Sequence, residues 1–381
     1  MAYRTTRSEI PQGAPASSLF CRAPVSSRQA PERLRLMTLP ITLPQDLPAG
    51  CTARLPVADD IEELTALVAA HQRFARGWAT VDIEGVTANV TGIGSWTRRQ
   101  VVVEAENGAI CAWAWVHDRA AGRTMPDVTV APAFDGADEV ARSLLGWVRE
   151  NAAALAAQRH LDCTQLDYTA YATDERQRRW FAEDGLEHTR TWLQMTRPVT
   201  GVDDLPPIRE GVTVRRVAKH HDGMPVAQDL QIVHQMLEES FADHFNSYRE
   251  SFPEFMQRLR EDPGHRWDHW WIADVVVDGE TVPGGALVAS VMSADSTGAE
   301  GSYVDYIGVH RRARGLGVAK ALLSTLIRDA YDRGRNRVDL EVDSDSPTGA
   351  NGLYESMGWV TKYSTESWHA EQYVDDVTDA S

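Results

Sequence analysis

The stretch that decides the fold is Val304-Asp-Tyr-Ile-Gly-Val-His-Arg-Arg-Ala-Arg-Gly-Leu-Gly-Val-Ala-Lys-Ala-Leu-Leu323. Its β-branched and aromatic beginning predicts a strand that ends near Val309. A basic turn with two glycines follows, and then Val318, Leu322 and Leu326 recur at the spacing of a buried helix face. The stretch therefore predicts a strand, a glycine turn and an amphipathic helix in direct succession.

The turn before this helix is a candidate anion cradle. Gly315 and Gly317 carry no side chain that would keep a ligand away from the backbone. The first N–H groups of a helix have no partner within it and lie at the positive end of its dipole. The plainer alternative is a strand-to-helix turn with a solvated basic rim, and two glycines alone do not exclude it.

A second motif, Leu353-Tyr-Glu-Ser-Met-Gly-Trp359, follows about 40 residues later. Together with Arg312-x-x-Gly315-x-Gly317, it resembles the GNAT (GCN5-related N-acetyltransferase) superfamily of acyl-CoA-dependent N-acyltransferases. The first motif resembles the pyrophosphate-binding loop of that family, and the second its Leu-Tyr-Glu-x-x-Gly-Phe signature. The resemblance is strong over residues 280–365 and faint before residue 200.

The resemblance implies a V-shaped opening between strands 304–309 and 337–342, into which the pantetheine arm of acetyl-CoA inserts. Backbone groups along the first strand would hold the pantetheine and the thioester carbonyl, and loop amides would hold the pyrophosphate. Ser346 stands where many relatives have Asn, and we expect it to cap the helix of the second motif. The cofactor-binding residues implied are Ile307, Gly308, Val309, Arg312, Ala313, Arg314, Gly315, Leu316, Gly317, Val318 and Ser346.

The same resemblance assigns a proton donor. Tyr354 matches the family tyrosine that protonates the departing CoA thiolate, and the alternative is a core tyrosine beside Leu353 and Met357. A base is also required, because an amine that arrives as ammonium must lose a proton before it attacks a thioester.

Strand alternation supplies a candidate for this base. It would place Tyr303, Asp305, Ile307 and Val309 on one face, which makes Asp305 the first candidate. Glu341 on the neighbouring strand is the second. A charged strand residue could equally pair with an arginine or fix the strand register.

The acceptor side is sought in Glu238-Glu-Ser-Phe-Ala-Asp-His-Phe245, where acids and aromatic residues would suit a cationic amine. We take Glu239 and His244 as candidate substrate-binding residues. His244 could instead cap a helix. The expected partner is a small-molecule amine, whose identity the sequence does not give.

The chain divides into a leader, two globular stretches and a linker. Residues 1–36 are rich in Arg, Ser, Ala and Pro without apolar periodicity, and we expect them to be disordered. Such a leader resembles an organellar transit peptide, or it is an upstream extension with Met37 as the natural start. Stretches 48–199 and 207–375 follow, joined by a linker over 200–207.

The two stretches read as a tandem duplication. Strands and helices follow in the same order in both, which predicts an α/β fold of two GNAT-like domains, each a mixed, mostly antiparallel sheet flanked by helices. If Val130 is set against Val309, Gly136 falls on Gly315 without a gap. This arrangement resembles mycothiol-synthase-like actinobacterial proteins.

The first copy departs from the motifs. Asp135-Gly136-Ala137-Asp138 stands in place of Arg314-Gly-Leu-Gly317, and Phe181 falls near the position of Tyr354. Acids where phosphates would lie oppose CoA binding, and a phenyl ring has no proton to give. We therefore expect a degenerate first domain that supports the fold and walls the acceptor pocket, with one CoA per chain.

Composition narrows the class of protein. The 381 residues carry 38 basic and 55 acidic side chains, a formal charge of -17, which makes nucleic acid an unfavourable partner. No metal-binding spacing, apolar membrane span or secretory signal is visible, so we expect reduced cysteines, no metal and a cytoplasmic protein.

Three functions remain open on the sequence. The first is N-acetyl transfer to a small amine by direct attack in a ternary complex. The second is transfer from a longer acyl-CoA or an aminoacyl-tRNA. The third is a catalytically silent CoA sensor or scaffold. The sequence does not give the oligomeric state.

Overall fold

The computed structural model of the chain describes residues 41–120, 122–241, 250–346 and 349–375. Two features treated above lie outside these residues. They are the leader and the candidate acceptor residue His244.

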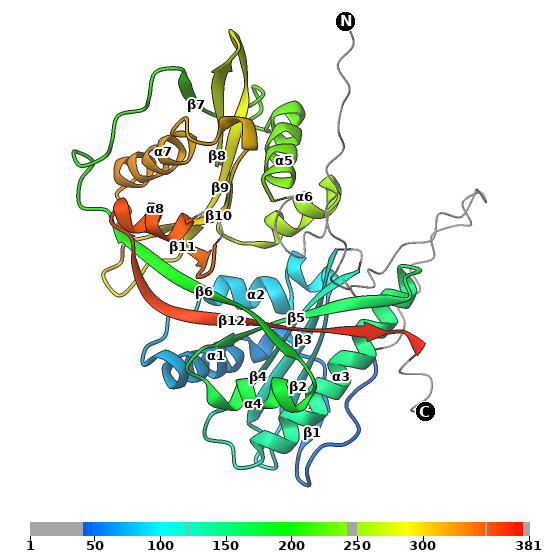
Figure 1. Ribbon diagram of the computed structural model, residues 1–381. Coiled ribbons are helices and arrows are strands. Elements are labelled where there is room, and N and C mark those ends of the chain that lie inside the picture. The colour runs from blue at the N-terminus through cyan, green and yellow to red at the C-terminus, as the bar shows by residue number, and fades with distance from the viewer. Residues whose placement is uncertain (1–40, 121, 242–249, 347–348, 376–381) are drawn as a thin grey trace, which may run out of the picture.

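The described residues form two halves with the same order of elements (Figure 1). The first half contains β1 (Thr52–Arg54), α1 (Ile61–Arg76), α2 (Ile83–Val90), β2 (Arg98–Glu104), β3 (Ile110–Ala120), β4 (Arg123–Val130), α3 (Ala137–Gln158), β5 (Cys163–Tyr171), α4 (Glu175–Glu183) and β6 (Glu187–Pro198). The second half contains β7 (Val212–Arg216), α5 (Ala227–Phe241), α6 (Phe252–Glu261), β8 (His265–Val277), β9 (Glu280–Met292), β10 (Gly301–Val309), α7 (Val318–Asp332), β11 (Arg337–Asp343), α8 (Ala350–Ser356) and β12 (Val360–Tyr373). Short 3-10 turns are η1 (Ala58–Asp60), η2 (Ile93–Thr97) and η3 (Arg311–Ala313).

Local sequence explains several of these boundaries. Ser251 begins α6 with a capping box, in which its hydroxyl accepts from the Glu254 N–H and the Glu254 carboxylate accepts from the Ser251 N–H. Gly77 ends α1 at φ 83°, a left-handed conformation in which glycine carries no Cβ penalty.

The strands of the described residues join into one twelve-stranded sheet, ordered β1-β2-β3-β4-β5-β12-β6-β11-β10-β9-β8-β7. Only the pairs β4–β5 and β10–β11 are parallel. Helices cover both faces of each half, with α7 opposite α5 and α6 in the second half (Figure 1). The mixed, mostly antiparallel sheet and the tandem arrangement confirm the predicted fold class.

The two halves exchange their closing strands. β6 ends the first half but pairs along its length with β11 of the second half, from Arg337 opposite Pro198 to Asp343 opposite Trp192. β12 ends the second half but pairs with β5 of the first, from Thr365 opposite Tyr171. The sequence pattern predicted the strands but not this exchange.

Two details differ from the sequence predictions. Gly136 is the N-cap of α3 and Gly317 the N-cap of α7, so the gapless match of Gly136 to Gly315 is wrong: the loop of the first half is two residues shorter. Cys163 is disulfide-bonded, so the expectation of reduced cysteines is wrong for this residue, because sequence spacing does not show which cysteines a fold brings together. Cys51 and Cys111 are free.

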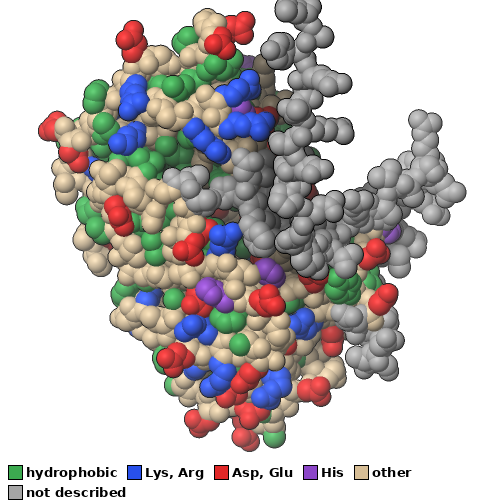
Figure 2. All heavy atoms as spheres, viewed as in Figure 1, with side chains coloured by type: hydrophobic (Ala, Val, Ile, Leu, Met, Phe, Trp, Pro, Cys, Tyr) green, Lys and Arg blue, Asp and Glu red, His purple; other side chains and the backbone are tan. Residues whose placement is uncertain are grey.

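The surface of the face shown in Figure 2 carries acidic and basic side chains interspersed, and no continuous basic surface spans it. Among the described residues, no helix is both long and apolar enough to cross a membrane.

Candidate active site

Strands β10 and β11 begin side by side and then diverge. They pair in parallel only from Gly301 opposite Arg337 to Tyr303 opposite Asp339. β10 continues to Val309 along β9, and β11 continues to Asp343 along β6. The facing edges of the two strands beyond this point therefore have no strand partner among the described residues. This divergence agrees with the V-shaped opening that the family resemblance implied.

A β-bulge at Asp305 changes the face to which later residues of β10 point. Val304 lies opposite Ala289 and Tyr306 opposite Val288, so Asp305 is the extra residue. Tyr306 packs in the core under α5 and α6, whereas Ile307 packs with Val304 on the α7 side. The prediction that Asp305 shares a face with Ile307 and Val309 is wrong, since simple alternation does not allow for a bulge.

The carboxylate of Asp305 lies in an enclosed environment. The Ser290 hydroxyl donates to its Oδ1 over 3.1 Å. Burial raises the pKa of Asp305 to about 8, with a further increase from the negative charge of Asp262, against the opposing effects of Ser290 and Arg258. A carboxylate with a pKa near neutrality is suited to general-base catalysis.

Glu341 on β11 lies near Tyr303 on β10, since its negative charge contributes to the raised pKa of the Tyr303 phenol. The Gln194 side chain donates to the Glu341 carboxylate over 2.9 Å. Burial raises the pKa of Glu341, yet its side chain keeps a large accessible surface. Glu341 follows Asp339, the last residue of β11 that pairs with β10, so it lies where the two strands diverge.

Tyr354 projects from α8, the short helix that follows β11. It is only 6% exposed, and its ring packs edge-on against Trp359 with the centroids 5.8 Å apart. Burial raises its pKa to about 12, so the phenol keeps its proton through neutral pH. Its packing also satisfies the plainer prediction of a core tyrosine, because Met357 belongs to the same hydrophobic cluster.

In the loop between β10 and α7, only some of the backbone amides that the resemblance implied are free to donate to an anion. The amides of Arg312, Ala313 and Leu316 already donate within the loop, to His310 Nδ1, to the His310 carbonyl and to the Ala313 carbonyl. The amides of Gly315, Gly317 and Val318 find no acceptor in the part of the chain that the structure describes. Both glycines have positive φ, 80° and 89°, which favours glycine at each position. The free amides at the start of α7 fit an anionic group.

Arg209, which no sequence motif contained, contacts this loop through its side chain. Its Nη1 donates to the Gly315 carbonyl over 3.0 Å, and a Cβ at Gly317 would come within 2.9 Å of its side chain. The side chains of Arg312 and Arg314 are exposed beside it. The loop therefore carries more positive charge than its own residues supply. Arg209 lies 106 residues before Gly315, so no local motif could have revealed it.

Glu239 contacts the beginning of the loop. His310 Nδ1 accepts from the Arg312 amide, so its Nε2 carries the proton that faces Glu239 Oε2 at 3.1 Å. Glu239 comes to this place because α5 packs closely on β10, where a Cβ at Gly308 would lie 2.9 Å from Ser240. The structure thus places Glu239 beside the glycine loop, and it does not test the expected substrate-binding role of this residue.

Ser346 does not cap the helix of the second motif. The N-cap of α8 is Gly349, without a side-chain cap, and Ser346 lies three residues earlier with its carbonyl accepting from the Gly349 amide. The capping prediction is wrong because the helix begins later than the motif suggested.

The corresponding opening in the first half is filled. β4 and β5 pair only from Arg123 to Thr124 before they diverge. Gln177 of α4 is buried there, and its Nε2 donates to the Val128 carbonyl over 3.3 Å. At the start of α3, the Asp138 carboxylate accepts from the Trp180 indole over 2.7 Å. Gln177 thus lies between the diverging strands of the first half, and an acidic side chain stands at the start of α3.

Phe181 completes this contrast between the halves. It lies four residues before the left-handed Gly185, as Tyr354 lies four residues before the left-handed Gly358. Its ring is buried and packs against Tyr168 at 4.8 Å. The first half therefore lacks a proton donor at this position.

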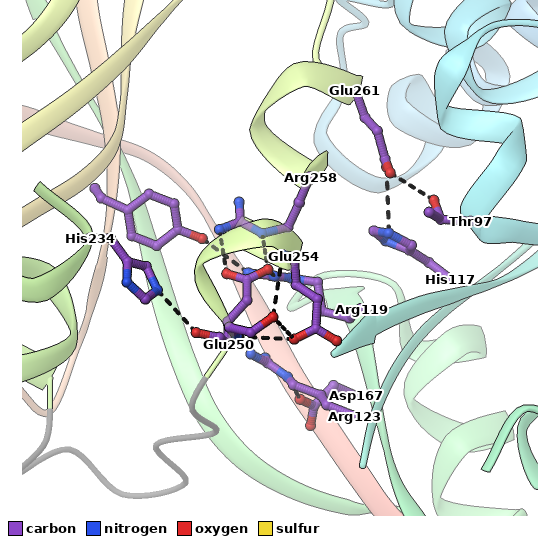
Figure 3. Close-up of polar contacts among 12 residues, drawn as sticks. Thr97, His117, Arg119, Arg123, Asp167, His234, Glu250, Glu254, Arg258 and Glu261 are labelled. Atoms are coloured by element: carbon purple, nitrogen blue, oxygen red, sulfur yellow. Dashed lines mark hydrogen bonds and ion pairs between the residues drawn. The ribbon is translucent and has the colours of Figure 1, made fainter. Parts of the chain in front are cut away.

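An ion-pair network joins the halves beside β10, the strand that carries Asp305 (Figure 3). Glu250, which precedes the N-cap residue Ser251 of α6, pairs with Arg119 of β3 and with Arg258 of α6. Arg119 also donates to the Tyr306 hydroxyl over 3.2 Å. Because Tyr306 follows the bulge at Asp305, a residue of the first half contacts the candidate catalytic strand.

A second part of the network surrounds Glu261 at the end of α6 (Figure 3). Its carboxylate accepts from the Thr97 hydroxyl over 2.8 Å and from Arg98 over 2.7 Å. His117 lies nearby, and burial together with the adjacent arginines lowers its pKa to about 2, so it is neutral. No group of three or more His, Cys, Asp or Glu side chains placed to hold a metal was found in the described ranges.

Comparisons with known proteins agree with this geometry. Residues 233–359 match the Acetyltransferase (GNAT) family. A GCN5-related N-acetyltransferase from Sphaerobacter thermophilus has a similar structure, with TM-score 0.67 and 25% identity, over 86% of this chain and 97% of that one. No curated protein matches the sequence.

Two more distant structures share the fold. A tandem GNAT protein from the clavulanic acid biosynthesis pathway has TM-score 0.61 and 14% identity, over 84% of this chain and 98% of its own. N-myristoyltransferase of Saccharomyces cerevisiae, solved with bound myristoyl-CoA and inhibitors, has TM-score 0.55 and 12% identity, over 87% and 82%.

Proposed function

We propose that this chain is an acyl-CoA-dependent N-acyltransferase that acetylates a small-molecule amine, because residues 233–359 match the GNAT family and the whole chain has the fold of tandem GNAT structures. The reaction takes place in the second half, by direct transfer in a ternary complex. The observation that supports this most is the divergence of β10 from β11 beyond Tyr303, which leads to a glycine loop with free amides.

Acetyl-CoA would lie along this path. Its pyrophosphate fits the amides of Gly315, Gly317 and Val318, with positive charge from Arg209, Arg312 and Arg314. Its pantetheine would pair with the free edge of β10 from Ile307 to Val309. When bound, the cofactor supplies an activated acetyl group as a thioester.

The chain's own residues supply the proton transfers. Asp305 removes a proton from the ammonium form of the acceptor, because only the neutral amine has a lone pair for attack. Tyr354 gives its phenolic proton to the leaving thiolate. Glu341 lines the acceptor side of the opening, where its negative charge favours a cationic substrate. Glu239 supports the loop through His310.

The first half serves as a support rather than a second active site. Gln177 and Asp138 occupy its opening and its helix start, and Phe181 has no proton to give. The proposal is therefore one acetyl-CoA per chain, with the first half forming a wall of the acceptor pocket.

Calorimetry with acetyl-CoA and an assay of thiol release over a panel of amines test this function together. We expect one binding site per chain and turnover with at least one cationic amine. Gly317→Val should weaken cofactor binding at least tenfold, since a branched side chain is strained at φ 89° and meets Arg209. Gly334→Val is the matched control, because that glycine has φ 72° and open space around it at the far end of α7.

Four results would contradict the proposal. Two equal cofactor sites would contradict a degenerate first half. Equal weakening of cofactor binding by Gly317→Val and Gly334→Val would show that binding does not depend on the glycine loop. Tight binding without turnover across the panel would favour a CoA-binding sensor, and turnover only with longer acyl-CoA donors or with aminoacyl-tRNA would change the donor.

A further inference from the structure

One imidazole joins three elements where the glycine loop between β10 and α7 begins. The His310 amide donates to the Gly284 carbonyl on β9 over 2.9 Å, so its backbone continues the strand pairing of β10. The His310 carbonyl accepts from the Ala313 amide over 2.8 Å, inside the loop. The residue is only 5% exposed, and its ring contacts α5. A buried ring on a fixed backbone has little freedom to exchange its hydrogen-bond partners.

The two ring nitrogens of His310 have opposite roles. Nδ1 accepts from the Arg312 amide over 3.2 Å, which makes this side chain the cap of η3, and Arg312 Nε lies 3.4 Å from the same atom. A ring nitrogen that accepts carries no proton, so the neutral imidazole has its proton on Nε2. Nε2 faces Glu239 Oε2 at 3.1 Å. The carboxylate is thus the partner that selects this tautomer.

Glu239 is itself held in place on α5. Its Oε1 accepts from the side-chain amide of Gln235, one turn earlier, over 2.8 Å. The helix packs so closely on β10 that a Cβ at Gly308 would lie 2.9 Å from Ser240, the residue after Glu239. Both oxygens of the Glu239 carboxylate therefore accept from side chains of the protein. This favours a supporting role over contact with an acceptor substrate.

The opposite tautomer of His310 would disturb the loop. With its proton on Nδ1, the ring would turn a donor toward the Arg312 amide, and that amide would lose its acceptor. The free amides of Gly315 and Gly317 follow in the same short loop. Their directions therefore depend on the cap that His310 provides.

We propose that Glu239 and His310 are positioning residues for the cofactor. Glu239 fixes the tautomer of His310, and His310 fixes the loop whose amides and arginines hold the pyrophosphate of acetyl-CoA. The proposal rests on the proposed function, because it requires the cofactor to bind at this loop. It moves Glu239 from the acceptor side, where the sequence placed it, to the cofactor side.

This role predicts the opposite of what the charge of Glu239 alone would do. A negative charge beside a phosphate site disfavours the phosphate, so an effect through charge predicts tighter cofactor binding when Glu239 is replaced. An effect through the tautomer predicts weaker binding. The Glu239 side chain is 39% exposed, so its replacement should leave the core intact.

Charge reversal at Glu239 separates the two explanations. In Glu239→Lys an ammonium group faces the Nε2 proton of His310, and two donors cannot form a hydrogen bond. We expect the dissociation constant of acetyl-CoA, measured by calorimetry, to rise by about tenfold or more. Glu239→Gln keeps an oxygen that can accept from Nε2, so its dissociation constant should stay within about threefold of the wild-type value.

Nitrogen NMR of the protein without cofactor reports the tautomer directly. The wild type and Glu239→Gln should show His310 protonated on Nε2 and unprotonated on Nδ1. Glu239→Lys should lose this pattern. The His310 signals are assigned by their disappearance in His310→Asn.

A double variant tests whether Glu239 acts through His310. Asn is a strong N-cap residue, and its side-chain oxygen can accept from the Arg312 amide without a carboxylate partner. In the His310→Asn background, Glu239→Lys should therefore weaken acetyl-CoA binding by less than about threefold. Asp332→Lys is the matched control, because this exposed acid ends α7 far from the loop, and its reversal should not weaken binding by more than about twofold.

The failure of this role differs from the failure of the proposed function. Unchanged or tighter acetyl-CoA binding in Glu239→Lys, or the same loss with and without His310→Asn, would overturn the positioning role. So would a wild-type His310 with its proton on Nδ1. In each of these cases the wild type still binds acetyl-CoA, whereas a wild type that does not bind acetyl-CoA would overturn the proposed function itself.

Discussion

At the scale of single residues, the surroundings of the two proposed proton-transfer groups, Tyr354 and Asp305, suit them to opposite roles. Tyr354 is buried among apolar side chains, which raises its pKa to about 12 and keeps it a donor. Asp305 is enclosed near other carboxylates, which raises its pKa to about 8 and makes it a usable base. Burial raises both pKa values, yet it favours a donor in one case and an acceptor in the other.

Replacing Tyr354 by Phe tests the donor. Tyr354→Phe removes one hydroxyl and keeps the ring that packs against Trp359, so the fold should be preserved. We expect kcat to fall by about 10- to 10³-fold, within the range that proton-transfer groups supply. Thiol release under saturating substrates measures it.

The matched control changes a tyrosine of similar burial without a proposed role. Tyr168→Phe in the first half removes a buried hydroxyl that has no hydrogen-bond partner among the described residues, and it should leave kcat within about twofold. An unchanged rate in Tyr354→Phe would remove this residue from the mechanism.

At the scale of elements, the loop between β10 and α7 shows where sequence reasoning succeeds. The glycines, the strand before them and the helix after them are local features, and the sequence predicted all three. Positive φ at Gly315 and Gly317 is the physical reason for the motif. The bulge at Asp305 and the late start of α8 at Gly349 depend on neighbouring strands and turns, so their effects were predicted wrongly.

Arg209→Ala tests whether a residue outside the sequence motifs contributes to acetyl-CoA binding. The guanidinium lies on the loop carbonyl of Gly315, so its loss should weaken acetyl-CoA binding by about 3- to 30-fold, and the loss should diminish as salt concentration rises. Calorimetry at two salt concentrations measures both effects.

Arg328→Ala is the control for net charge. This exposed arginine lies in the third turn of α7, away from the loop, and its loss should leave the dissociation constant within about twofold. Equal effects of the two variants would assign the change to long-range charge and not to a contact at the loop.

At the scale of the whole molecule, the first half contributes contacts that the second half lacks by itself. Arg119 reaches Glu250 and the Tyr306 hydroxyl, and it does so from β3 (Figure 3). The order of elements and the duplication could be predicted from periodicity within each stretch. The exchanged strands and the network between the halves could not, since both depend on contacts between residues more than 100 positions apart.

Arg119→Met tests this support. Removing one member of a buried ion pair leaves charge on Glu250 that Arg258 only partly compensates, so the free energy of unfolding should fall by about 3 kcal/mol. Activity should fall as well, because Tyr306 loses its contact next to Asp305. Chemical denaturation and the thiol-release assay measure the two effects.

Arg123→Met is the matched control. Its partner Asp167 lies within the first half and the pair is more exposed, so the expected loss is at most about 1 kcal/mol, with activity retained. Equal destabilisation by the two variants, or full activity of Arg119→Met, would contradict a supporting role for the network.

The exchange of closing strands also limits how such a protein can be taken apart. A fragment cut at the 200–207 linker and retaining only the later residues would expose the edge of β11 and leave β12 without β5 and β6 on either side. Hydrolysis of a single peptide bond in that linker leaves every strand pairing intact. The two pieces therefore remain held together by strand pairing. Gene fission at this point would yield an obligate heterodimer instead of two independent enzymes.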